Sequence, residues 1–227
     1  MIRAVSIFFL VIILALCYAQ VASPEQEKMN KTDQIKLPKP ILKGKISLEE
    51  AILNRRSIRS YKQDQLSLEQ IGQLLWAAGG ITAESGERQY RTAPSAGAIY
   101  PIQIYALYKK GLFHYNPFEH SLDMVKDEDL RRDLTSVCGG QGSISQAPFV
   151  IIICGDYSKV TSRYGQRGVR YTDIETGHIA ENIHLQAVAL GLGSVPIGSY
   201  DDGKVREILG LGAGLDPLYI IPAGYAK

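Results

Sequence analysis

The sequence has little net charge and few cysteines. Lysine plus arginine number 25 and aspartate plus glutamate 23, so the formal net charge is +2. Without the first nineteen residues, which contain Arg3 and no acid, the balance is 24 − 23 = +1. A chain so close to neutral lacks the basic surface of a nucleic-acid-binding protein. Its three cysteines, without CxxC spacing, are too few for a disulfide scaffold and indicate neither a zinc nor a thiol redox site.

Common motifs for metal and phosphate binding are absent as well. There is no P-loop, and residues 210–214 (GLGAG) follow a predicted helix instead of a strand, so we interpret them as a loop. The four histidines show no HExxH pattern and no acidic cluster adds a ligand, so we expect surface or core histidines and no metal site. They are His114, His120, His178 and His184.

The composition otherwise fits one globular domain with a tail. The 227 residues are 45% hydrophobic and 21% charged, which excludes disordered, collagen-like and polytopic membrane classes. Arg3, the apolar run 4–16 and the small-x-small residues 17–19 predict a signal peptide over residues 1–19, or alternatively an uncleaved anchor. In both cases the folded part is exported, periplasmic or otherwise outside the cytoplasm. Residues 20–46, polar and proline-containing, are expected to form an extended tether.

The hydrophobic pattern of residues 47–227 predicts a single α+β domain. A capping box at Ser47–Glu50 opens the first helix. The unbroken apolar run 149–154 is typical of a strand buried on both faces, where Cys154 is expected as a buried thiol. In an oxidising compartment Cys138 and Cys154 are alternatively a disulfide pair. Helices are expected over residues 48–54, 66–78, 173–190 and 204–209, and a short helix is expected to be capped by Asp127. Strands are expected over residues 102–108, 112–115 and 122–125, which form a meander, and over residues 149–154, 194–197 and 218–221.

Three segments carry residues that packing alone does not require. Residues 55–59 (RRSIR) place three guanidinium groups and a hydroxyl where they can converge on a phosphate; alternatively they are an exposed basic helix end. Residues 92–101 (TAPSAGAIYP) predict a stiff loop able to lie against a flat ligand, or a plain loop. Residues 193–199 (GSVPIGS) are predicted to present backbone N–H groups at a strand end, or to be a turn that needs glycine.

Residues 93–97 also imitate the nucleophile elbow of serine hydrolases, with Ser95 as nucleophile. That elbow lies between a strand and a helix, whereas this segment leads into a strand. The last histidine, His184, falls inside a predicted helix instead of following an acid near the end of the chain. A hydrolase using Ser95 is therefore the weakest of the alternatives.

In this order, the three segments resemble the nitroreductase-like flavoproteins, which are FMN-dependent oxidoreductases. The resemblance runs from about Leu48 to Lys227. Residues 111–122 (GLFHYNPFEHSL) and 163–194 resemble more narrowly the SagB-like dehydrogenase branch, which includes azoline oxidases. The resemblance implies a central, mostly antiparallel sheet flanked by helices, and an interlocked homodimer with FMN at the subunit interface.

The resemblance also implies roles for individual residues. Two catalytic roles follow: Arg59 would stabilise negative charge on the reduced flavin, and Tyr164 would relay a proton. Azoline oxidases carry Lys-Tyr where this chain has Arg163-Tyr164, and arginine cannot act as the base. Many relatives carry asparagine at the position of Ala98. The cofactor-binding set is Arg55, Arg56, Ser57, Arg59 and Lys227 at the phosphate and pyrimidine side, Pro94, Ser95, Ala96 and Gly97 from the partner subunit, and Pro196, Ile197 and Gly198 behind the ring.

The sequence therefore predicts an exported FMN-dependent oxidoreductase that transfers hydride through flavin N5 to or from a small organic substrate. Nicotinamide is scarce outside the cytoplasm, so we expect the electron donor to be a membrane or protein partner, or the substrate itself with oxygen as acceptor. Nicotinamide is the remaining alternative. A non-catalytic flavin-binding module is the principal alternative.

Overall fold

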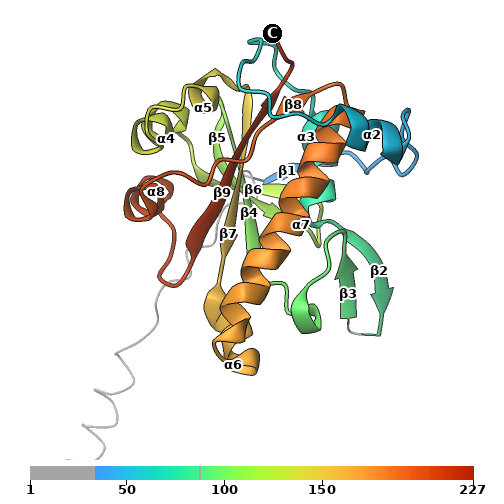
Figure 1. Cartoon of the computed structure of the whole chain (residues 1–227), viewed down its shortest axis with the longest axis vertical. Helices are drawn as coiled ribbons and strands as arrows, with labels where there is room; N and C mark the ends of the chain where they lie inside the picture. Colours follow the sequence, from blue (N-terminus) through green and yellow to red (C-terminus); the bar gives the residue numbers. More distant parts are fainter. Residues whose placement is uncertain (1–33, 87) are drawn as a thin grey trace, which may run out of the picture. The chain divides into compact units, whose positions relative to one another are not determined.

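The computed structural model describes residues 34–86 and 88–227. Seven strands form one sheet in the order β1-β6-β5-β4-β7-β9-β8, and neighbouring strands pair antiparallel. Figure 1 shows this sheet with helices on both sides. The α+β class and the antiparallel sheet flanked by helices are thus confirmed. The predicted meander is formed by β4 (Ile102–Tyr108), β5 (Gly111–Asn116) and β6 (Ser121–Lys126).

The central strand β7 (Phe149–Gly155) is buried along its whole length, as its apolar run predicts. It pairs with β4 on one side and with β9 (Asp216–Gly224) on the other. Successive side chains point to opposite faces of a strand. Ile151 and Ile153 therefore join one hydrophobic core, whereas Val150 and Ile152 join a second core behind the sheet.

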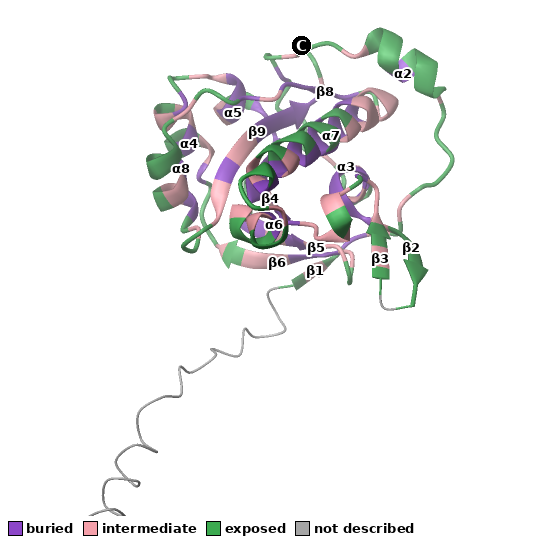
Figure 2. Ribbon diagram, turned by 60° about the horizontal axis from the view of Figure 1, so that its bottom comes forward, coloured by how far each residue is buried: buried purple, intermediate pink, exposed green. Residues whose placement is uncertain are grey.

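The two cores are covered by different helices, whose buried faces Figure 2 shows. The first lies under α3 (Leu68–Gly79) and the long α7 (Arg167–Ala189). The second lies under α4 (Arg131–Val137), α5 (Ser143–Gln146) and α8 (Asp202–Leu209). The short α2 (Leu48–Asn54) packs against α7, and its predicted N-cap Ser47 accepts a hydrogen bond from the Glu50 N–H at 3.1 Å.

Several local predictions need correction. Part of the predicted tether is packed, because β1 (Gln34–Lys36) pairs with β6 and Leu37 is only 8% exposed. The short charged helix is α4, which begins at Arg131 with no side-chain cap, so Asp127 does not cap it. Further elements were not predicted, among them the hairpin of β2 (Ile81–Ser85) and β3 (Arg88–Arg91), α5, and α6 (Tyr157–Tyr164). The short β8 (Gly193–Ser194) completes the sheet.

The alternative of a disulfide between Cys138 and Cys154 is wrong. Cys138 and Cys154 are both free and buried, and burial raises the pKa of the Cys138 thiol to about 11. The predicted signal peptide, residues 1–19, and tether residues 20–33 lie outside the described residues. No helix within residues 34–86 and 88–227 has the length and apolar character needed to span a bilayer.

Candidate functional site

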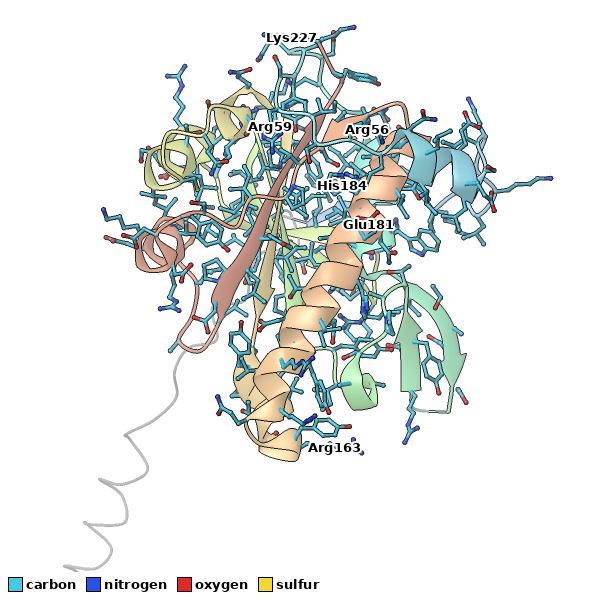
Figure 3. All side chains as sticks on the ribbon, in the orientation of Figure 1. Arg56, Arg59, Arg163, Glu181, His184 and Lys227 are labelled. Atoms are coloured by element: carbon cyan, nitrogen blue, oxygen red, sulfur yellow. The ribbon has the colours of Figure 1, made fainter. Side chains whose placement is uncertain are left out.

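Cationic side chains gather near the C-terminal half of α7. Figure 3 shows Arg56, Arg59 and Lys227 at this end of the molecule, above His184 and Glu181. The Lys227 N–H donates to the Ser60 carbonyl at 3.2 Å, which places the last residue beside the RRSIR segment. Within the described part of the chain, neither Arg59 nor Lys227 forms an ion pair. This end of the molecule therefore carries uncompensated positive charge.

The other two arginines of the segment have partners. Arg55 is half-buried, and its Nε lies 3.9 Å from Glu181 Oε1 of α7. The Arg56 guanidinium donates to the carbonyls of Leu53 at 2.9 Å and Arg55 at 2.7 Å. Arg56 thus complements the C-terminal end of α2, as the alternative interpretation of a basic helix end expected. Arg59 is the arginine of this segment most available to a ligand.

The first and third predicted segments are joined side by side. Ser57 and Ser194 form a parallel bridge, and the Ile58 N–H donates to the Ser194 carbonyl at 3.0 Å. A Cβ atom on Gly193 would lie 2.6 Å from the Ile58 side chain, so glycine permits this close approach. The joint places the arginines next to the Pro196–Gly198 loop.

A buried histidine lies beneath this joint. His184 Nδ1 and Ser194 Oγ share a hydrogen bond of 2.9 Å, and the two residues are 4% and 1% exposed. Burial, assisted by the charge of Arg55, lowers the pKa of His184 to about 4. The imidazole is therefore neutral at pH 7 and supports the third segment. His184 is thus a core histidine, one of the two alternatives expected for the histidines, and nothing in the sequence marks its pairing with Ser194.

The Pro196–Gly198 loop leaves one backbone donor available. The Ile197 N–H donates to the Ile220 carbonyl at 2.8 Å, and Pro196 has no N–H. The exposed Gly198 N–H has no hydrogen-bond acceptor in residues 34–86 and 88–227. A ligand placed against this loop can accept a hydrogen bond from Gly198.

The second predicted segment lies elsewhere in the chain. Gly97 has a φ of 63°, and a Cβ there would lie 2.7 Å from the Tyr164 hydroxyl and 2.9 Å from Arg163 Nη1. Figure 3 shows Arg163 at the opposite end of α7 from Arg59. The loop of Pro94, Ser95, Ala96 and Gly97 therefore packs against the C-terminal end of α6, where Arg163 and Tyr164 lie. The Tyr164 ring also contacts the ring of Tyr171 in α7 edge-on, with the ring centres 5.4 Å apart. A single chain does not bring Arg59 and Tyr164 together.

Ser95 has no histidine partner among the described residues. Its Oγ accepts a hydrogen bond from the Tyr100 N–H at 2.9 Å, and it also bonds the Glu175 carboxyl group. Burial raises the pKa of Glu175 to about 7, although Ser95 and Arg91 oppose the increase. The serine–histidine pair that a hydrolase needs is absent at Ser95. In the described ranges, no group of three His, Cys, Asp or Glu residues is arranged to hold a metal ion.

The donor set at the joint fits the FMN that the resemblance implies. Arg55 and Arg59 are permanently charged, and Ser57 adds a hydroxyl in the same segment, so together with Lys227 they suit a phosphate dianion. The free Gly198 N–H suits an acceptor on a flat ring next to that phosphate. FMN has a negative end and a planar polar end, and the chain presents donors for both.

Comparisons with known proteins identify the family of the chain. The model of the nitroreductase family matches residues 52–225. A solved structure from Ralstonia eutropha, assigned as a nitroreductase, superposes with a TM-score of 0.78 at 28% identity and covers 86% of this chain and 90% of that one. Protein MJ1384 of Methanocaldococcus jannaschii, also assigned as a nitroreductase, is 38% identical over 202 residues, which are 86% of this chain and 98% of that protein.

Two more distant relatives have named roles. The FMN reductase [NAD(P)H] of Bacillus subtilis is 24% identical over 185 residues, 76% of this chain and 61% of that protein. The microcin B17-processing protein McbC of Escherichia coli, from the SagB-like branch, is 27% identical over 160 residues, 66% of this chain. The aligned part spans 58% of McbC, so the chain matches little more than half of that relative.

Proposed function

This chain belongs to the nitroreductase family of FMN-dependent oxidoreductases, and we propose that it is exported and transfers hydride to or from a small organic substrate. The observation that carries the proposal is the cationic cluster of Arg55, Arg59 and Lys227, joined through Ser57–Ser194 to a loop with a free Gly198 N–H. Bound FMN supplies the redox chemistry at its N5 atom. The chain's own residues bind and orient it.

The proposed roles follow from charge and position. Arg55, Ser57 and Lys227 hold the phosphate, with Glu181 fixing the Arg55 guanidinium from the side. Arg59 stabilises negative charge that develops at the pyrimidine edge of the ring, since a cation beside developing negative charge lowers its energy. Gly198 donates its backbone N–H to the ring, and His184 keeps the loop in place through Ser194.

We propose a homodimer that completes the site. The Pro94–Gly97 loop and Tyr164 lie at the far end of α7 from Arg59, so a second copy is needed to bring them to the same cofactor. Large apolar side chains around α2 remain exposed beside a hollow of about 410 Å³ between α2, α3 and α7, which a second copy would cover. They are Ile41, Leu42, Leu48, Ile52 and Leu53, between 56% and 80% exposed.

Export is proposed from the sequence of residues 1–19 alone. Because nicotinamide is scarce outside the cytoplasm, the proposed donor is a membrane or protein partner, with nicotinamide as the alternative. Cell fractionation followed by N-terminal sequencing tests the location. A chain recovered in the cytoplasm that still begins at Met1 would overturn it.

Replacement of Arg59 by alanine tests the hydride-transfer role. The variant should bind FMN but show a lower flavin reduction potential and a turnover about ten- to a hundredfold below wild type, as expected for the loss of one charge-assisted hydrogen bond. Arg132→Ala, at an exposed position of α4 outside the proposed FMN site, is the matched control. A wild-type potential and turnover for Arg59→Ala would contradict the assignment.

The wild-type protein itself distinguishes the enzyme from the alternative of a non-catalytic flavin-binding module. A wild-type protein that binds FMN and is reduced by no donor would favour the flavin-binding module.

A further inference from the structure

A separate cavity of about 260 Å³ lies beside the hairpin, away from the cationic cluster. It opens between β3, β4, β5 and the turn that follows β5. Its polar walls come from Arg91, Gln103, His114, Asn116 and Asp123, and Phe118 forms an aromatic wall. None of these residues has a role in the FMN site proposed above.

Arg91 is a half-buried cation that forms no ion pair with the described residues of the chain. Its guanidinium carbon lies 4.8 Å from the centre of the Tyr100 ring and 5.8 Å from that of Phe118. No carboxylate of residues 34–86 and 88–227 comes within 4.0 Å of it, and the hydrogen bond to the Tyr100 hydroxyl is made by the Arg91 backbone N–H. Burial lowers the pKa of Arg91, although the charge of Glu175 opposes the decrease. A desolvated charge is costly unless an anion pairs with it.

The other polar groups of the cavity are already engaged. His114 Nε2 and Gln103 Oε1 are 2.7 Å apart, and Asp123 accepts a hydrogen bond from Gln34 at 2.7 Å. The Asn116 side-chain oxygen accepts hydrogen bonds from two backbone N–H groups of the following turn. Arg91 is the cation of this lining, and within residues 34–86 and 88–227 it forms no ion pair with Asp123 or with another acid.

The buried acid Glu175 is not an ion-pair partner of Arg91. Glu175 and Arg91 both line a small void of about 10 Å³ and do not form an ion pair. Because the pKa of Glu175 is raised to about 7, a large part of this carboxyl group is protonated at neutral pH. Glu175 therefore compensates the charge of Arg91 only in part.

We propose that this cavity binds a small organic acid, whose carboxylate pairs with the Arg91 guanidinium and whose apolar part lies against Phe118. The planar fork of arginine matches a carboxylate through two parallel hydrogen bonds. Ile102 and Ile104 complete an apolar lining that suits a compact organic acid better than a hydrated inorganic phosphate. The volume lies just below the usual range for ligand pockets, so the ligand is small. This site does not rest on the function proposed above.

Benzoate and its neutral isostere benzamide are suitable probes. Calorimetric titration of the FMN-loaded protein should show benzoate binding about tenfold or more tightly than benzamide, as expected for pairing with a charged group. Arg91→Gln should weaken benzoate binding by about ten- to a hundredfold and leave benzamide unchanged. Arg132→Gln, which removes an exposed arginine behind the sheet, should retain wild-type binding of both probes.

Several outcomes would overturn the proposal. Equal affinities of the wild-type protein for benzoate and benzamide, or no benzoate binding at about 10 mM, would do so whether or not Arg91→Gln folds. Benzoate bound elsewhere on the protein would show the same affinity in Arg91→Gln as in wild type. As a second variant, Phe118→Ala removes a 66% exposed side chain and should weaken both probes by a similar factor. Failure of FMN binding would overturn the proposed function instead, since no residue of this cavity belongs to the cationic cluster.

Discussion

The neutral state of His184 should make the free energy of unfolding depend on pH. Its pKa is about 4 in the folded chain, against the 6.5 of an unperturbed histidine, which represents the unfolded chain. Between these values the unfolded chain binds more protons, so stability is lost as the pH falls from about 6.5 toward 4. The two pKa values correspond to a loss of about 2 kcal/mol at pH 5 and about 3 kcal/mol below pH 4.

Replacement of His184 by glutamine isolates this contribution, because glutamine can still hydrogen-bond Ser194 and does not titrate. Urea unfolding of both proteins, with FMN in the same excess, gives their difference in unfolding free energy at pH 7 and pH 5. The wild-type protein should lose about 2 kcal/mol more than the variant over this interval. His178→Gln, at an exposed position of the same helix, is the matched control. A difference between wild type and His184→Gln that stays constant from pH 7 to pH 5 would refute the reasoning.

Two further predictions concern Gly193, at the joint between the first and third segments, and Glu175 of α7. Gly193→Ala places a Cβ 2.6 Å from the Ile58 side chain and should reduce the free energy of unfolding, measured with urea, by about 1–3 kcal/mol. Gly177→Ala, whose Cβ would meet nothing within 4 Å, is the control and should not reduce it. Equal stability of the two variants would contradict the close approach of Gly193 to Ile58. Glu175 has a raised pKa, so the folded chain loses stability as the pH rises from about 4.5 to 7. The unfolding free energy of Glu175→Gln relative to wild type should therefore increase by up to about 3 kcal/mol between pH 4 and pH 8, and a constant difference would count against a buried, titrating Glu175.

Elements with strong apolar patterns could be predicted from the sequence. Strand β4 has the predicted bounds Ile102–Tyr108, and β7 extends the predicted strand by one residue, because strands buried this deeply need apolar runs. Elements that bury little could not be found in this way. Val160 is the only buried residue of α6, and none of the described residues in strands β2 and β3 is buried. The edge strand β1 lies in a polar stretch and depends on pairing with β6.

The candidate site was only partly accessible to sequence reasoning. Charge density identified the RRSIR segment, but the different partners of Arg56 and Arg59 depend on where α2 ends. The contact between His184 and Ser194 arises when α7 packs beside β8, and no local pattern encodes it. Arg91 gave no signal at all, because a single arginine in a polar hairpin shows its lack of a partner only when the fold surrounds it.

The visible absorption spectrum of the purified chain from Gln20 to Lys227, recorded before and after addition of FMN, shows directly whether the chain binds this cofactor. We expect a yellow protein whose resolved flavin band is bleached by a chemical reductant, and an Arg55→Ala/Arg59→Ala double variant that retains less FMN through gel filtration. A colourless protein that takes up no added FMN would contradict this expectation.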